Sequence, residues 1–227
     1  MYTLRNVTKI YRTSRGPIAA LDDITLGIAD GEWVAIQGAT GGGKSTLLQL
    51  LGGLDRPTTG EVVFDDMNTG VRLDSIPESA VTTARAERIG FVFQGFNLIP
   101  TLSATDNVAA ALRPLGVRAE VAATRARTAL AQVGLGDRVD HLPAALSGGQ
   151  QQRVAVARAL VKNPDVILAD EPTGNLDEKM RDEIVALFAS IRDESGITLV
   201  IVTHDSYVAA QAGRVVTLTN GRLTQAA

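Results

Sequence analysis

Residues 38–45, Gly-Ala-Thr-Gly-Gly-Gly-Lys-Ser, fit the pattern G-x-x-x-x-G-K-[ST]. Glycines let a backbone wrap closely around phosphate oxygens and point N–H groups at them, and a helix beginning near Gly43 adds the positive end of its dipole. In such a loop Lys44 neutralises the β- and γ-phosphates and the Ser45 hydroxyl ligates Mg²⁺. The alternative is a glycine-rich turn before an ordinary helix. The apolar runs 33–36 and 46–51 predict a strand before the loop and a helix after it, which favours a nucleoside triphosphate site.

Two adjacent carboxylates, Asp170 and Glu171, follow the aliphatic run 166–168. That run is typical of an inner parallel strand, so Asp170 is expected at its carboxyl end, where open α/β sheets bind ligands. We expect Asp170 to hold Mg²⁺ through water and Glu171 to polarise the attacking water. Adjacent acids after an apolar run are common, and it is the phosphate loop upstream that makes this pair informative.

Residues 146–150, Leu-Ser-Gly-Gly-Gln, lie between these two motifs. Ser147 and Gln150 have the spacing of a capping box, which predicts a helix from Ser147 to about Leu160. One interpretation is merely a well-capped helix. The other is a second phosphate site, because a Ser-Gly-Gly helix start offers N–H donors and a hydroxyl. A chain with two such helix starts satisfies both only by facing a second subunit.

The three motifs, in this order, resemble the nucleotide-binding subunit of an ATP-binding cassette transporter over essentially the whole chain. The resemblance implies an α/β fold: a P-loop NTPase (RecA-like) core with an N-terminal antiparallel β subdomain and an inserted α-helical subdomain. It also implies two ATP molecules with Mg²⁺ held between two copies, where residues 146–150 of one copy close over the γ-phosphate bound by the other.

Four further positions match motifs of that family. Tyr11 matches the aromatic residue that stacks on adenine, and Gln94 the glutamine that meets Mg²⁺ and the attacking water. Asp177, in Asn175-Leu176-Asp177, matches an aspartate carried across the dimer interface, and His204 matches the histidine that contacts the γ-phosphate. Taken singly, the tyrosine has the pattern of a surface or core residue, the glutamine of a strand end and the histidine of a solvated turn.

The expected site is therefore extensive. The expected catalytic residues are Lys44, Gln94, Glu171 and His204, and the expected Mg²⁺ ligands are Ser45, Gln94 and Asp170. The expected nucleotide contacts are Tyr11, Gly38, Ala39, Thr40, Gly41, Gly42, Gly43, Lys44, Ser45, Thr46, Ser147, Gly148, Gly149, Gln150 and Asp177.

Composition agrees with the expectation of a soluble enzyme; if it works at a membrane, it does so from the surface, through a partner. The 227 residues are 45% hydrophobic and carry a formal net charge of −3, so no bulk positive charge suggests nucleic-acid binding. The absence of cysteine excludes disulfides, thiolate metal sites and thiol catalysis. No apolar stretch approaches about 18 residues, and the first residues do not resemble a signal peptide. The resemblance to transporter subunits implies a peripheral protein on the cytoplasmic face of the membrane, attached through a partner.

The chain is expected to form one domain over residues 1–227. Strands are predicted within 2–28, with a turn at 13–17, and the α/β core follows from 32 to about 93. Segment 96–146 has a helical pattern, with a capping box at 103–106 and a helix at 120–133, and it separates 1–95 from 147–227. Strands near 199–203 and 215–219 end the chain. One buried helix face is predicted at Ile184, Leu187, Phe188 and Ile191.

Segments 89–100 and 170–177, with the long first hairpin around 16–21, resemble the macrolide-export and lipoprotein-release type. That type implies a homodimer driving a permease with few transmembrane helices and a large extracytoplasmic domain. A departure lies at 39–42, Ala-Thr-Gly-Gly where that branch has Pro-Ser-Gly-Ser. Two alternatives stay open: a cassette that regulates cell-wall remodelling or peptide sensing, and a soluble cassette acting on ribosomes or DNA. The second cassette or long coiled coil typical of the soluble types is not seen here.

Overall fold

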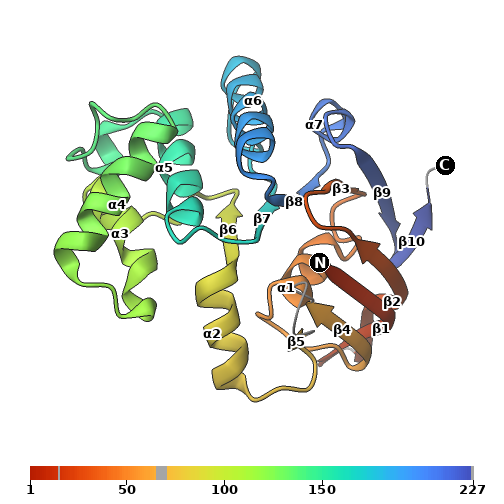
Figure 1. Ribbon diagram of the computed structural model, residues 1–227. Coiled ribbons are helices and arrows are strands. Elements are labelled where there is room, and N and C mark those ends of the chain that lie inside the picture. Colours follow the sequence, from red (N-terminus) through yellow and green to blue (C-terminus); the bar gives the residue numbers. More distant parts are fainter. Residues whose placement is uncertain (15, 65–70, 226–227) are drawn as a thin grey trace. The chain divides into compact units, whose positions relative to one another are not determined.

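The computed structural model describes residues 1–14, 16–64 and 71–225. The chain forms two compact units (Figure 1), one of Met1–Thr82 with Thr198–Ala227 and the other of Thr83–Ile197. The boundary near residue 82 falls within helix α2 (Glu78–Arg88). Each unit is described by itself. The predicted helical subdomain, 96–146, lies inside the second unit, and its limits stay a prediction.

The first unit contains an antiparallel sheet in the order β2-β1-β4-β5. Its strands are β1 (Tyr2–Thr13), β2 (Gly16–Ile28), β4 (Thr59–Phe64) and β5 (Val71–Arg72). β1 and β2 form the long hairpin, from Tyr2 opposite Ile28 to Thr13 opposite Gly16. The inward residues Leu4, Ile24 and Phe64 are almost fully buried. The predicted β subdomain and hairpin are confirmed, except that Arg15 in the turn lies outside the described residues.

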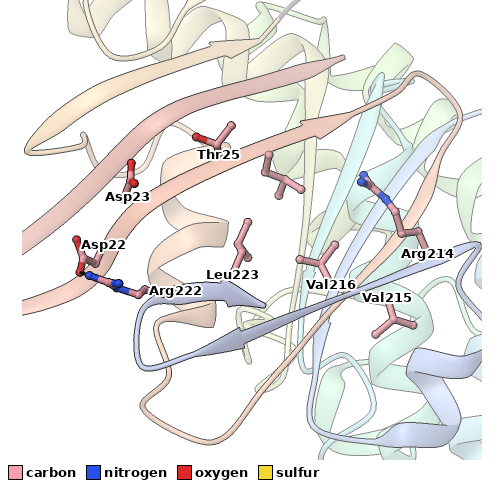
Figure 2. Close-up of a pocket in the computed structure, with 9 residues that line it drawn as sticks. Asp22, Asp23, Thr25, Arg214, Val215, Val216, Arg222 and Leu223 are labelled. Atoms are coloured by element: carbon pink, nitrogen blue, oxygen red, sulfur yellow. Dashed lines mark hydrogen bonds and ion pairs between the residues drawn. The ribbon is translucent and has the colours of Figure 1, made fainter. Parts of the chain in front are cut away.

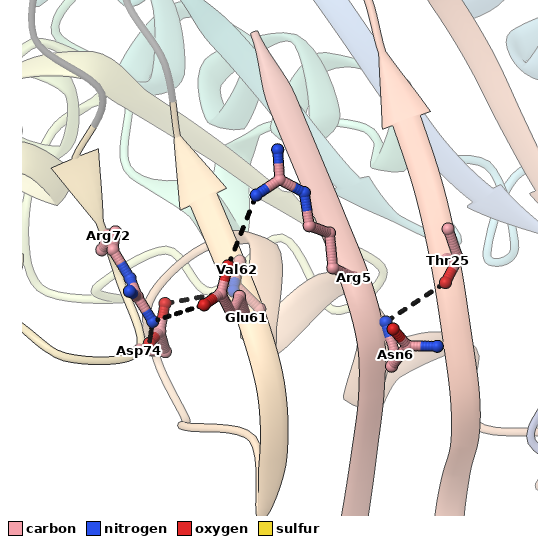
Figure 3. A network of polar contacts seen from close by, with 7 residues as sticks. All are labelled: Arg5, Asn6, Thr25, Glu61, Val62, Arg72 and Asp74. Atoms are coloured by element: carbon pink, nitrogen blue, oxygen red, sulfur yellow. Dashed lines mark hydrogen bonds and ion pairs between the residues drawn. The ribbon is translucent and has the colours of Figure 1, made fainter.

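Charged side chains link three strands of this sheet (Figure 3). Arg72 pairs with Asp74 at 2.9 Å and with Glu61 at 3.1 Å, and Glu61 also faces Arg5 at 3.5 Å. Asp74 accepts a hydrogen bond of 3.1 Å from the Val62 amide. Most of these side chains are exposed to solvent, so the ion pairs contribute little to the stability of the fold. Their main effect is to link neighbouring strands at this edge of the sheet.

The first unit also holds the parallel strand β3 (Trp33–Gln37) between β8 (Thr198–Thr203) and β9 (Arg214–Thr219). Trp33 to Ile36 are at most 3% exposed, as expected for an inner strand. α1 (Lys44–Leu51) follows β3, and α7 (Ser206–Ala210) follows β8. A strand that the sequence did not predict, β10 (Arg222–Gln225), pairs with β9 in antiparallel fashion.

The second unit combines helices with two parallel strands, β6 (Ile89–Phe93) and β7 (Val166–Asp170). Its helices are α3 (Ala104–Ala109), η1 (Ala110–Leu115), α4 (Ala119–Gln132), η2 (Pro143–Ala145), α5 (Gly148–Leu160) and α6 (Glu178–Ser195). Val108, Leu112 and Leu130 of the first three helices are fully buried. The predicted helices at 103–106, 120–133 and 147–160 are therefore confirmed.

Two details of the helices differ from expectation. On α6, Ile184, Val185 and Phe188 are buried, whereas Leu187 and Ile191 are only half-buried. The buried stripe is therefore rotated toward Val185, and the predicted face is only partly right. At α3, Ser103 caps the helix, but the Asp106 carboxylate accepts from the Ser103 hydroxyl at 2.7 Å, not from its amide. In the part of the chain that the structure describes, no helix is long and apolar enough to cross a membrane.

Candidate functional site

Two glycines of the phosphate loop, Gly38 and Gly43, sit where a side chain would not fit. A Cβ on Gly38 would collide with the carbonyl oxygen of Leu218, and one on Gly43 with the carbonyl oxygen of Ala20. Gly43 also has φ +98°, a conformation that side-chain-bearing residues rarely adopt. At these two positions the loop packs against the chain's own backbone too closely for any residue but glycine.

Lys44 lies across this loop instead of extending into solvent. Its side chain is 7% exposed, and its Nζ donates to the carbonyl oxygens of Gly38 at 2.8 Å and Ala39 at 3.0 Å. No described side chain caps the N-terminus of α1, where Gly43 is the N-cap. Backbone donors, the positive end of a helix and a held ammonium group are the donor set that phosphate oxygens need, so the residues present fit a triphosphate.

His204 belongs to the same end of the first unit as the loop. β3 and β8 are parallel, with Gln37 opposite Thr203, so Gly38 and His204 leave neighbouring strand ends. His204 is exposed, and the next residue, Asp205, caps α7 by accepting from the Tyr207 amide at 2.7 Å. The structure therefore brings His204 to the edge of the sheet from which the phosphate loop starts.

The second unit brings Gln94 and the two acids to one sheet edge. Phe93 is opposite Asp170 in the β6–β7 pair, so Gln94 and Glu171 emerge side by side. Glu171 has φ +46°, an uncommon conformation for a glutamate and one often found at functional sites. Asp170 ends β7, as the sequence predicted.

The segment after Glu171 is fastened to Gln94. The side-chain amide of Asn175 (Nδ2) donates to the backbone carbonyl oxygen of Gln94 at 2.9 Å. The side-chain amide of Gln94 (Nε2) donates to Asn175 Oδ1 at 3.3 Å. A Cβ on Gly174 would lie 2.8 Å from Gln94 Nε2, so a larger residue at this position would require the Gln94 side chain to shift. Gln94 is thus hydrogen-bonded to the segment that precedes Asp177.

Sequence reasoning missed a buried residue that supports this loop. Gln152 of α5 is fully buried, and its amide donates to the Pro172 carbonyl oxygen at 2.6 Å. The sequence does hold a hint: Gln152 lies two residues before Val154, Ala155 and Val156, an apolar run that is buried in the structure. A buried amide in such surroundings needs a specific acceptor.

The expected capping box at the start of α5 is present in both directions. The Ser147 amide donates to Gln150 Oε1 at 2.9 Å, and the Gln150 amide donates to Ser147 Oγ at 3.3 Å. Gly149 is packed so that a Cβ would lie 3.2 Å from Met180. Asp177 caps α6 by accepting from the Met180 amide at 2.8 Å. The roles predicted for Ser147, Gly149 and Asp177 at a neighbouring subunit stay predictions.

Tyr11 lies on β1 in the first unit, half-buried, with its hydroxyl donating to Asp55 at 2.9 Å.

The remaining expected residues divide between the units. Thr40, Ser45 and Thr46 belong to the first, and Gln94 and Asp170 to the second. The three predicted Mg²⁺ ligands therefore come from both units.

Two cavities lie outside these motifs. One, of about 530 Å³, opens in the first unit between β2 and the β9–β10 pair (Figure 2), with Leu223 and Val216 among its walls. At one end Arg222 pairs with Asp22 at 2.7 Å. None of the predicted site residues lines it. The other, of about 320 Å³, lies in the second unit and is lined by residues that include Phe91, Phe93, Arg158 and Lys162.

A phosphate loop that continues a buried parallel strand, together with a helix started by Ser-Gly-Gly-Gln and a strand ending in two acids, defines an ATP-binding cassette. The match to known sequences agrees: residues 21–174 fit the ABC transporter family, and the chain belongs to that family. It is accordingly an ATPase, and its cofactors are ATP and Mg²⁺.

Relatives of two different chain lengths match this sequence. The chain is 44% identical to the macrolide export ATP-binding/permease protein MacB of Rhodopirellula baltica, over 99% of this chain but 33% of the relative. It is 45% identical to the lipoprotein-releasing system ATP-binding protein LolD of Geobacter metallireducens, over 96% of this chain and 95% of that one. The chain thus spans about a third of the length of the MacB relative.

Solved structures agree with the fold. The dimeric structure of MJ0796, a bacterial ABC transporter cassette, matches with a TM-score of 0.89 and 43% identity, over 99% of this chain and 97% of that one. A dimeric post-hydrolysis state of MJ0796 bound to ADP and Pi matches with the same TM-score and 42% identity. The predicted fold class, family and enzyme class are confirmed.

Proposed function

We propose that this chain is the ATP-hydrolysing subunit of a membrane transporter of the macrolide-export or lipoprotein-release type. In this proposal two copies close around two Mg-ATP on the cytoplasmic face of the membrane and drive a permease. The observation that carries it is the phosphate loop with Lys44 held across it, in a chain that also has the Ser147 helix start. The likeness to MacB and LolD over nearly the whole chain supports the branch.

The proposal assigns the triphosphate to residues 38–46. The N–H groups of the loop and of the first turn of α1 bind phosphate oxygens, and Lys44 exchanges its hydrogen bonds to loop carbonyls for the β- and γ-phosphates. The hydroxyl of Ser45 ligates Mg²⁺, with Gln94 and Asp170 completing the protein side of that site. When bound, Mg²⁺ neutralises charge on the transferring phosphoryl group.

Glu171 accepts a proton from the attacking water in this scheme, because Asp170 is the acid committed to the metal. The backbone of Glu171 at φ +46° is held by the Gly174 amide, which donates to the Glu171 carbonyl at 3.1 Å. His204 contacts the γ-phosphate from the strand end next to the phosphate loop. The held backbone fixes the point from which the carboxylate extends, which favours correct placement of the water.

The second copy contributes Ser147, Gly149 and Asp177 to each ATP. Closure then depends on the γ-phosphate, since only ATP offers the charge that the partner's helix start binds. The dimers of MJ0796 support this arrangement. Hydrolysis removes that contact, so the pair reopens and the change in affinity between open and closed states is available for transport.

We assign the permease contact to the cavity lined by Phe91, Phe93, Arg158 and Lys162. The rings of Phe91 and Phe93 stack in parallel with centroids 5.6 Å apart, giving an apolar wall. Burial, together with a smaller effect of the neighbouring Arg85 charge, lowers the pKa of Lys162 to about 8, so an acidic group docking there would meet desolvated cations. Gln94 follows Phe93 directly, which would couple this contact to the site.

The test uses tagged Glu171→Gln purified with ATP from detergent-solubilised native membranes, with Lys44→Ala as the matched variant that does not bind ATP. We expect loss of ATPase activity, an ATP-stabilised dimer and a stoichiometric integral membrane protein. Normal hydrolysis by Glu171→Gln would overturn the catalytic assignment. Recovery without any integral membrane protein would discard the transporter assignment and favour a soluble cassette.

The docking assignment is tested in the same preparation by Lys162→Glu, which reverses the charge in the cavity. Arg127→Glu, a charge reversal at an exposed position on α4, is the control. We expect recovery of the membrane protein to fall with Lys162→Glu only. Equal recovery with both variants would place the contact elsewhere.

A further inference from the structure

The hydroxyl of Tyr11 is fixed by a carboxylate from a distant part of the sequence. Tyr11 donates to Asp55 Oδ2 at 2.9 Å, while Lys9 Nζ donates to Asp55 Oδ1 at 2.6 Å and to the Arg56 carbonyl oxygen at 2.7 Å. All four residues belong to the first unit. The tyrosine is thereby locked at its far end as well as at its backbone.

Asp55 is in turn tied to the helix of the phosphate loop. The Asp55 amide donates to the Gln49 carbonyl oxygen at 3.4 Å and the Leu54 amide to the same oxygen at 2.9 Å, at the end of α1. The position of the Tyr11 hydroxyl is therefore tied, through Asp55, to the C-terminal end of the helix that starts at the phosphate loop.

The two sides of the ring differ. The ammonium group of Lys9 lies over the Tyr11 ring, 5.0 Å from its centroid, so one face is occupied by a cation. Across the β1–β2 pair, Ile18 is directly opposite Tyr11 and is 56% exposed. Cross-strand neighbours share a face of the sheet, which places exposed apolar surface beside the ring.

We propose that Asp55 and Lys9 are positioning residues that hold the Tyr11 ring with one face presented to the base of the nucleotide. This inference rests on the proposed function, in which Tyr11 stacks on adenine. A ring free to rotate about its side-chain bonds loses that freedom when a base stacks on it, whereas a ring already fixed does not. Asp55 and Lys9 therefore act on affinity for the base, not on the phosphates.

The charges keep this arrangement intact at neutral pH. Burial and the hydrogen bond to Asp55 raise the pKa of Tyr11 above its ordinary value, so the phenol remains a donor. At Asp55 burial acts to raise the pKa, but the hydrogen bonds from Lys9, the Arg56 amide and Tyr11 outweigh it, so the pKa lies below its ordinary value. The acceptor therefore stays ionised.

The experiment compares two ligands that differ in the base. Binding of ADP and of inorganic tripolyphosphate to the full chain is measured calorimetrically for Asp55→Asn, Tyr11→Phe and the double variant. Asp74→Asn is the matched control, because Asp74 is also a half-buried carboxylate of the first unit paired with a cation, Arg72. Tyr11→Ala tests the stacking itself.

We expect Asp55→Asn and Tyr11→Phe each to weaken ADP binding about three- to tenfold, as partial loss of a base–aromatic stack predicts. The double variant should bind ADP no more weakly than the more affected of the two single variants, because both substitutions remove the same hydrogen bond between Tyr11 and Asp55. Tripolyphosphate affinity should be unchanged in all three, which also reports an intact phosphate loop, and Asp74→Asn should bind both ligands normally. In hydrolysis assays KM for ATP should rise while kcat stays constant.

Three outcomes separate the inference from its premise. Equal weakening of both ligands by Asp55→Asn would mean that Asp55 supports the loop generally, and the positioning role would be discarded. A normal Asp55→Asn together with weak ADP binding by Tyr11→Ala would overturn the positioning role while keeping the stack. Normal ADP binding by Tyr11→Ala would overturn the stacking assignment in the proposed function.

Discussion

Replacing Asn107 with alanine should cost more stability than most single substitutions in this chain. Asn107 of α3 is 1% exposed and fastens the segment that follows Gln94 by four hydrogen bonds. Its Oδ1 accepts from the Ile99 amide at 2.7 Å, and its Nδ2 donates to the carbonyl oxygens of Ile99, Leu102 and Ser103 at 3.1, 2.9 and 3.0 Å. The Asn107 side chain thus hydrogen-bonds the backbone groups of an irregular segment that runs from Ile99 to Ser103.

The magnitude follows from counting what Asn107→Ala leaves unpaired. An amide nitrogen has only two hydrogens, so its three contacts amount to about two full bonds. With the bond to Oδ1, about three bonds are lost, each with a net contribution of about 1 kcal/mol. Part of the exposed backbone regains water, so we expect a loss of about 2–4 kcal/mol in the free energy of unfolding.

Urea unfolding followed by far-UV circular dichroism measures this loss. The matched variant is Ser103→Ala, which removes the cap of the same helix and should cost about 1 kcal/mol. If Asn107→Ala cost no more than Ser103→Ala, the segment from Ile99 to Ser103 would be held by other contacts, and our reading of the network would be refuted.

Three further substitutions probe the site and its surroundings. Gly43→Ala should abolish ATP binding in a titration, because φ +98° alone costs a side-chain-bearing residue about 1–2 kcal/mol and the new Cβ meets the Ala20 carbonyl oxygen; retained affinity would contradict the loop geometry. Gln152→Leu should destabilise by about 1–3 kcal/mol by leaving the buried Pro172 carbonyl unpaired, and should lower kcat in a phosphate-release assay. Because the folded pKa of Lys162 is about 8 against 10.5 for a free lysine, the unfolded chain binds more protons between these values, so stability should rise with pH across that window. Lys162→Met should lack this rise in chemical unfolding measured from pH 8 to 10.5, and an identical pH profile would rule Lys162 out as its source.

The parts of the fold that sequence predicted are those in which local pattern and burial agree. The run 33–36 is buried because it is an inner strand with apolar residues on both faces. The helix at 147–160 could be predicted because both residues of its capping box, Ser147 and Gln150, lie within four positions of each other. The motif residues are local in the same sense. A phosphate loop, a capping box and a strand-terminal acid pair each need only neighbouring positions to be recognised.

What sequence did not predict depends on long-range contacts. β10 has little apolar character of its own, and it is a strand because β9 offers an edge with which it pairs. The Lys9–Asp55 ion pair joins positions 46 residues apart, so neither residue stands out alone. The rotation of the buried face on α6 toward Val185 is likewise decided by what packs against the helix, which periodicity alone cannot specify.

Under the proposed function, the two helix starts would bind an anion with different strengths. At α1 the N-cap is Gly43, which has no side chain to satisfy the first-turn donors, so an anion there gains their full attraction. At α5 the Ser147 hydroxyl already accepts from the Gln150 amide at 3.3 Å, so a phosphate that binds this amide must first displace an existing hydrogen bond and gains less than at α1. In the proposed function, binding at α5 would therefore be weak by itself and would become significant only when the phosphate is already fixed on another chain. The difference between an uncapped and a capped helix start predicts the order of events: nucleotide binding first, then closure of the pair.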